Sequence, residues 1–141
     1  TMGQVLSAKL LALISIIVLT LLPSLLFVQT VAVLGFPKSN FDSSLILGGY
    51  LALFLLILCF VGFGVLASSL SRKQPVAFIL GLVLNFVFWQ GAKEVGLEAL
   101  DLSSHYNRLS MGLLSISDLI FFLGFFLLLW GSIRFRLRQI I

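Results

Sequence analysis

The feature that most constrains this chain is a series of long apolar runs almost free of charged side chains. The first extends from Leu10 to Leu34 and contains one proline, Pro23. As a helix it measures roughly 37 Å at about 1.5 Å per residue, and the hydrocarbon core of a bilayer is about 30 Å thick. We therefore expect this run to cross a membrane as one tilted helix.

Three more runs follow, over residues of about 45–70, 75–91 and 117–133. Strands that cross membranes alternate apolar and polar residues, whereas these runs are apolar on every face. Composition agrees, because 60% of the residues are hydrophobic and 10% are charged, against roughly 25% charged in soluble domains. The sequence predicts an all-α polytopic membrane protein, with a single transmembrane domain over residues 1–141.

Basic and acidic residues separate between the segments that join these spans. With the N-terminus in the cytoplasm, six of the nine bases fall on the cytoplasmic side: Lys9, Arg72, Lys73, Arg134, Arg136 and Arg138. The opposite side receives the other three bases and all five acids: Lys38, Lys93, Arg108, Asp42, Glu94, Glu98, Asp101 and Asp118. Because lysine and arginine accumulate in short cytoplasmic loops, we predict that both chain ends are cytoplasmic.

The tight turn formed by Arg72, Lys73 and Gln74 then lies in the cytoplasm, with Pro75 at the start of the next helix. The net charge of +4 does not indicate nucleic-acid binding. The bases lie close to membrane exits, and no reader module accompanies them. We therefore expect membrane lipids with anionic headgroups, and no nucleic acid, as their partners.

The segment over residues 92–115, between the third and fourth spans, is mixed in polarity. Its apolar residues recur at spacings of three and four and predict one helix face at the outer interface: Val95, Ala99, Leu102, Tyr106, Leu109 and Leu113. Ser103 and Ser104 could divide it into two short helices, the second capped by a serine. The segment is either a plain connector or an outer gate, which would use His105, Tyr106, Arg108 and Asp118.

We expect Asp118 in the first turn of the last helix, after a Ser115 or Ser117 cap, and favour a simple capping role for it. Inside the spans the polar exceptions are Gln29, Asn85 and Gln90, which line a pathway or form interhelical hydrogen bonds. Two pairs of small residues four apart predict close helix packing: Gly48 with Ala52, and Gly64 with Ser68.

Motifs for catalysis, cofactors and metals do not occur in the sequence. There is no HExxH, no Walker lysine loop and no GxSxG, and Cys59 is the single cysteine. His105 lacks a second ligand in sequence, so we expect it to form hydrogen bonds rather than to catalyse. The predicted spans also lack the buried acid or base that an ion-coupled transporter needs. Transport by this chain would therefore take its energy from another subunit.

Two stretches, SSLSRKQPVAFILGLVLNFVFW and HYNRLSMGLLSISDLIFF, resemble the permease subunit of the gliding-motility-associated ABC transporter, within the ABC-2-type exporter permeases. The matching residues are Ser68, Ser69, Leu70, Gln74, Val76, Ala77, Phe78 and Ile79, then His105, Tyr106, Ser110, Gly112, Asp118, Ile120 and Phe122. Lys9 and Pro23 match the earlier part of the pattern. Arg72, Lys73, Met111 and Ser115 depart from it.

The resemblance implies a permease with six spans, of which these four are the last, and short re-entrant helices before the final span. It implies pairing with a second permease copy or paralogue and with an ABC ATPase subunit that binds ATP and Mg²⁺. It also implies the bacterial inner membrane as the location and no enzymatic activity in this chain. The alternative is a scaffold that anchors a larger machinery without transporting anything.

Overall fold

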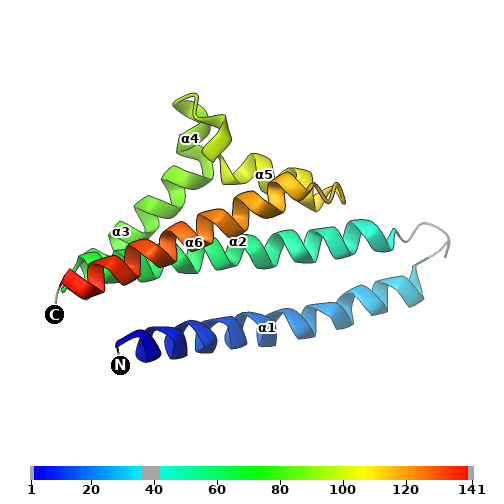
Figure 1. Ribbon diagram of the computed structural model, residues 1–141. Helices are drawn as coiled ribbons and strands as arrows, with labels where there is room; N and C mark the ends of the chain where they lie inside the picture. Colours follow the sequence, from blue (N-terminus) through cyan, green and yellow to red (C-terminus); the bar gives the residue numbers. More distant parts are fainter. Residues whose placement is uncertain (1, 36–41, 140–141) are drawn as a thin grey trace.

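The computed structural model describes residues 2–35 and 42–139. Four long helices dominate it (Figure 1): α1 (Met2–Leu34), α2 (Ser43–Leu70), α3 (Gln74–Phe86) and α6 (Ile116–Gln139). α3 continues through the π-helical turn η1 (Val87–Gly91) into α4 (Ala92–Glu94). Four helical rods are thus long and apolar enough to cross a membrane, and the described residues contain no strand. The predicted all-α fold with four membrane-spanning helices is confirmed.

α2 is the central helix of the bundle. α3, α6 and the short helix α5 (Leu102–Ser110) all pack against it. In the most apolar stretch of α2, 39% of the residues are buried, whereas in that of α1 only 6% are buried. α1 runs beside α2 (Figure 1), and the hydroxyls of Ser24 and Tyr50 lie 2.8 Å apart between them. Nearly all of the apolar surface of α1 is therefore left to lipid or to a partner.

The two chain ends and the α2–α3 turn lie at one end of the bundle, while α5 and the start of α6 lie toward the other (Figure 1). Lys9, Arg72 and Arg134 belong to the first end, and Asp101 and Asp118 to the second. Lys38 and the side chain of Arg138 are outside the described residues. The separation of bases from acids along the sequence is thus also a separation in space.

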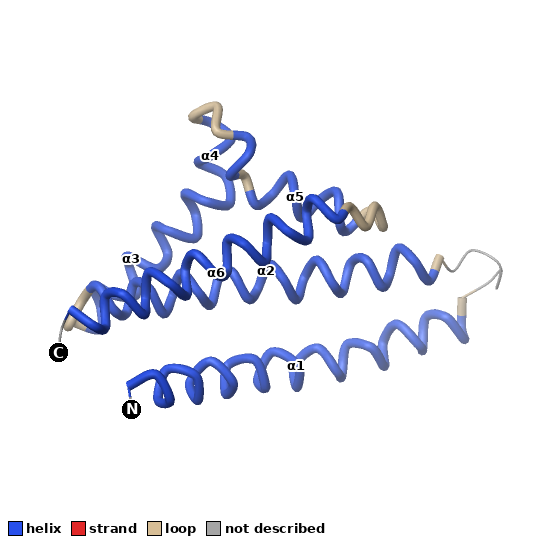
Figure 2. The backbone as a smooth tube through the Cα atoms, in the orientation of Figure 1, coloured by secondary structure: helices blue, strands red, loops and turns tan. Residues whose placement is uncertain are grey.

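The α2–α3 turn is short and exposed. Ser71 ends α2, and its Oγ accepts a hydrogen bond of 3.2 Å from the backbone N–H of Lys73. Helix α3 begins at Gln74, with Pro75 in its first turn, where a missing N–H leaves no bond unmade. Loops are confined to the junctions between helices (Figure 2), and this turn presents Arg72 and Lys73 outward.

The outer segment is folded differently from the single amphipathic face predicted for it. Gly96 has a φ of +79°, and the chain reverses there before the 3₁₀ turn η2 (Glu98–Leu100). Val95 and Leu113 are 76% and 61% exposed. The predicted continuous face is therefore wrong, because a left-handed glycine breaks the helical repeat. The buried face of α5 consists of Leu102, His105 and Leu109.

The two pairs of small residues differ in their packing. Gly48 and Ala52 are buried, and a Cβ on Gly48 would lie 2.9 Å from the carbonyl oxygen of Leu109 in α5. Gly64 and Ser68 are exposed, and a Cβ on Gly64 would meet no atom within 4 Å. Close packing therefore describes the first pair. At the second pair the backbone of Gly64 lies close to α3, because a Cβ on Gly81 would be 3.8 Å from the Cα of Gly64.

Candidate functional site

Helix α5 is started by Asp101, which is fully buried. Its carboxylate accepts hydrogen bonds from the backbone N–H groups of Ser103 and Ser104, each at 3.3 Å. The two serine hydroxyls also donate to it, at 2.9 and 2.5 Å. The predicted serine cap is therefore wrong, because both serines lie in the first turn and an aspartate occupies the capping position.

Asp101→Ala is expected to lower the free energy of unfolding by about 1 kcal/mol, the usual contribution of a helix cap. Burial raises the pKa of Asp101, but hydrogen bonds from Ser104 and Ser103 outweigh this effect, so the pKa lies below its ordinary value. A carboxyl with a depressed pKa stabilises the fold above its unfolded pKa of about 3.9 and loses this contribution as pH falls through the folded value.

Unfolding curves of the wild type and the Asp101→Ala variant in detergent, from pH 7 downward, test this prediction. The difference in stability is expected to be constant above about pH 5 and to shrink on further acidification. A difference that persists unchanged in acid would contradict the capping role of the carboxylate.

His105 and Arg108 of α5 meet Asp118 of α6. The Nδ1 of His105 lies 2.5 Å from Oδ1 of Asp118. Arg108 donates from Nη2 to the same oxygen at 2.7 Å and from Nε to Oδ2 at 3.3 Å. Two N–H groups of one guanidinium thus hold both carboxylate oxygens, a geometry that fixes orientation as well as charge. We call these three residues the outer cluster.

Asp118 is the buried member of the outer cluster, with 1% of its surface exposed. It lies in the first turn of α6, as predicted, where the positive end of the helix dipole favours a carboxylate. The expectation that the spans carry no buried acid is nevertheless wrong. A carboxylate in such a place requires a partner, and two basic side chains on α5 supply it.

Both ring nitrogens of His105 have a polar neighbour. Its Nε2 is 3.3 Å from the carbonyl oxygen of Ala99. Its Nδ1 faces Oδ1 of Asp118 and also lies 2.8 Å from Nη2 of Arg108. The imidazole is therefore held between the backbone of η2 on one side and the Asp118–Arg108 pair on the other.

Aromatic rings cover the outer cluster on its inner side. The ring of Phe121 stacks on that of His105, with centroids 3.8 Å apart and planes inclined by 14°. Phe122, which is 1% exposed, presents its edge to the same imidazole at 6.5 Å. These rings exclude water from the imidazole and strengthen its interaction with the carboxylate.

The remaining candidate residues lie elsewhere. Tyr106 packs on Trp89, with centroids 5.8 Å apart, and does not join the outer cluster. Gln29 and Gln90 are exposed on separate helices, and the Oδ1 of Asn85 is buried without a hydrogen-bond partner among the described residues. The structure thus does not bring the three predicted pathway amides together. The basic turn of Arg72, Lys73 and Gln74 lies at the opposite end of the bundle.

The fold and the outer cluster together define a polytopic α-helical membrane protein. In it a buried ion pair between His105 and Asp118 links the last long helix, α6, to the short helix α5. Within residues 2–35 and 42–139 no group of three His, Cys, Asp or Glu side chains could hold a metal ion. In comparisons with family models, curated proteins and solved structures, the chain matches none of them.

Proposed function

We propose that this chain is the membrane-spanning part of an ABC-2-type exporter permease, driven by a separate ATPase subunit. It would form one half of the translocation pathway and pair with a second permease copy or paralogue. The ATPase would bind ATP and Mg²⁺. In this proposal the chain lies in the bacterial inner membrane with both ends in the cytoplasm, and it serves an export system of the kind associated with gliding motility.

The observation that carries this proposal is the fold of the outer segment. Between the third and last rods the chain forms η2 and α5, and α5 returns onto α2. Short helices before the final span are what the resemblance to ABC-2-type permeases implies. Three residues of the resembling stretch fix this segment: His105 and Asp118 through their ion pair, and Gly112 through its φ of +78°.

Gly112 follows the end of α5 and lies against the start of α2. Its N–H donates to the carbonyl oxygen of Leu109 at 3.0 Å, and a Cβ at this position would lie 3.5 Å from Cα of Leu45. The left-handed conformation favours glycine here. The residues that carry the resemblance therefore have a shared structural task, which supports the assignment of this segment.

The outer cluster gives the proposed transport cycle a rigid element. Closure of the ATPases on nucleotide would rock the permease halves and shift the pathway between inward and outward access. Because Asp118 holds α5 to the first turn of α6, the outer segment and the last span would move as one body. Opening on the outer side would then require α5 and α6 to separate together from the partner permease.

The test is whether the protein, extracted in mild detergent, co-purifies with an ABC ATPase and raises its rate of ATP hydrolysis after reconstitution in nanodiscs. We expect stimulation that depends on the presence of both proteins. Absence of any association in detergent and in nanodiscs would contradict the proposal.

The scaffold alternative is separated from transport by an ATPase that cannot hydrolyse ATP. A transporter loses its cellular phenotype when paired with such a partner, because the conformational cycle stops. A scaffold retains the phenotype as long as the complex assembles. The amount of complex in the membrane is therefore measured alongside the phenotype.

A further inference from the structure

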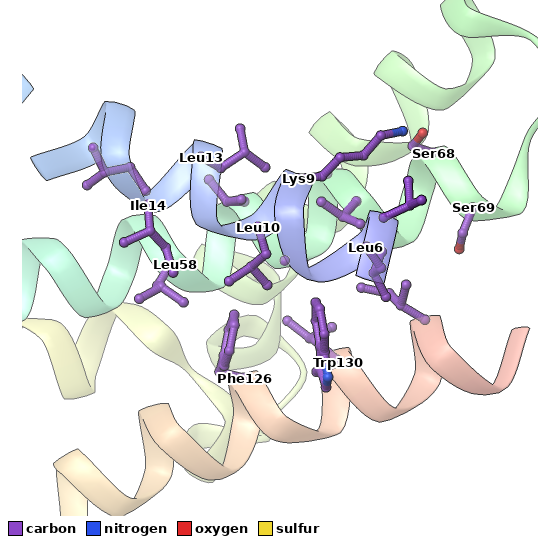
Figure 3. A pocket seen from close by; sticks show the side chains of 18 residues that line it. Leu6, Lys9, Leu10, Leu13, Ile14, Leu58, Ser68, Ser69, Phe126 and Trp130 are labelled. Atoms are coloured by element: carbon purple, nitrogen blue, oxygen red, sulfur yellow. The ribbon is translucent and has the colours of Figure 1, made fainter. Parts of the chain in front are cut away.

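A groove opens between α1, α2 and α6 at the end of the bundle that carries the chain termini (Figure 3). Its volume is about 480 Å³, within the range of roughly 300–1,000 Å³ that is usual for ligand sites. Most of its wall is aliphatic or aromatic, and includes Leu10, Leu13, Ile14, Leu58, Phe126 and Trp130. Its ligand must therefore be largely apolar.

One end of the groove is cationic. Lys9 is the one charged residue among the 18 that line it, and its side chain extends toward Ser68 (Figure 3). No carboxylate lies within ion-pair distance of Lys9 in the described part of the chain. A second cation, Arg134, lies beside the start of α1, with its Nη2 3.9 Å from where a Cβ would stand on Gly3.

Two serines line the same end of the groove as Lys9, namely Ser68 and Ser69 from the last turn of α2. The hydroxyl of Ser69 donates to the carbonyl oxygen of Leu66 at 2.7 Å, so its hydrogen does not serve an anionic ligand. Ser68 is the serine toward which the side chain of Lys9 extends (Figure 3). An ammonium and a serine hydroxyl with hydrogens to donate are suited to a phosphate group.

From this charge complementarity we propose that the groove binds one anionic phospholipid. Its acyl chain would lie between α1, α2 and α6, and its phosphate would contact Lys9 and Ser68. A cationic or purely apolar occupant would leave the ammonium of Lys9 without a counter-charge. This site is independent of any ATPase, so it stands or falls separately from the proposed export function.

The fluorescence of Trp130, which lines the groove, can report on lipid binding there. The chain contains two tryptophans, so the Trp89→Phe variant leaves Trp130, on the groove wall, as the only one. Brominated acyl chains quench tryptophan fluorescence on contact. We would place this variant in nanodiscs of unbrominated phosphatidylcholine containing a small fraction of brominated phosphatidylglycerol or of brominated phosphatidylcholine.

We expect phosphatidylglycerol to quench Trp130 with about fivefold higher relative affinity than phosphatidylcholine, the factor that one lysine near an anionic lipid supplies. Lys9→Gln is expected to abolish the preference. Lys93→Gln, which removes an exposed lysine far from the groove, is expected to retain it. Equal quenching by the two lipids in the parent variant, or a preference that survives Lys9→Gln, would overturn the proposal.

A second pair of variants tests occupancy of the groove without changing charge. Gly64→Leu places a side chain into the groove, where a Cβ meets no atom within 4 Å. Gly49→Leu makes the same change on the same helix, also without a contact within 4 Å, but outside the groove. Quenching by the anionic lipid is expected to fall in the first variant only. An equal effect of both, or of neither, would contradict a lipid at this place.

Discussion

Asp118→Asn is expected to lower the free energy of unfolding by about 3 kcal/mol, the lower end of the range for breaking a buried ion pair. Asparagine has nearly the same shape, so the change leaves no cavity. It removes the negative charge that His105 and Arg108 share. The side chain of Arg108 is 53% exposed and regains water, which limits the loss to this lower value, whereas the side chain of His105 is 11% exposed and stays buried without its partner.

The measurement is reversible unfolding in mixed micelles of increasing denaturing detergent, followed by the loss of helical circular dichroism. Asp42→Asn is the matched control. Asp42 caps α2 and is exposed, and asparagine caps a helix about as well as aspartate, so the free energy of unfolding is expected to change little. Similar losses in the two variants would show that the outer cluster does not stabilise the fold.

A double-mutant cycle isolates the contact itself. Asp118→Asn and His105→Gln are expected to be non-additive by about 1–3 kcal/mol, because each removes one partner of the same short contact. Additive losses would mean that the two side chains act separately, in contradiction to the 2.5 Å distance between them.

The sequence was sufficient to predict the four spans because every run carries almost no charge, and because the first two are longer than the roughly 30 Å hydrocarbon core of a bilayer. In the hydrocarbon core of a bilayer there is no water to bond the backbone, so each segment must form its own backbone hydrogen bonds, and an α-helix does this within one segment. The apolar runs therefore predict helices with little help from tertiary packing. The third helical span is Gln74–Glu94, which is longer than the predicted 75–91. The predicted run alone would be too short to cross a core of about 30 Å.

The outer cluster was not predictable as a contact. His105 and Asp118 are 13 residues apart, and the chain reverses between them at Gly112. The spacing of apolar residues carries no information about such a reversal. The predicted helix face therefore extended from Val95 to Leu113, whereas α5 covers only Leu102–Ser110. Asp101 did offer a signal, because an aspartate before two serines and a helical segment is a capping pattern.

The surroundings of the two pairs of small residues could not be predicted from the sequence either. Gly48 with Ala52 and Gly64 with Ser68 have identical spacing on one helix, and sequence alone gives no reason to separate them. They differ in what a side chain would meet. A Cβ on Gly48 would point at the backbone of α5, whereas a Cβ on Gly64 would point into the open groove, although α3 approaches the Cα of Gly64 at Gly81. Which of these directions is covered depends on where the outer segment returns to α2.

Gly48→Ala is expected to destabilise the protein by about 1–3 kcal/mol, the usual effect of overpacking. The new Cβ would lie 2.9 Å from the carbonyl oxygen of Leu109 and 3.0 Å from Cα of Gly112. Both atoms belong to the backbone and cannot move as a side chain can. Relief requires α5 to shift away from α2, and α5 carries two members of the outer cluster, so the strain reaches the contacts of Asp118.

Gly49→Ala is the matched control, because it makes the same change one position along the same helix, where a Cβ meets no atom within 4 Å. Removing a glycine from a helix interior is expected to stabilise by about 0.5–1 kcal/mol. The two neighbouring substitutions should therefore have opposite signs in the same unfolding experiment. If Gly48→Ala were also stabilising, α5 could not lie against α2 at this distance, and the outer cluster would lose the support that holds His105 and Arg108 at Asp118.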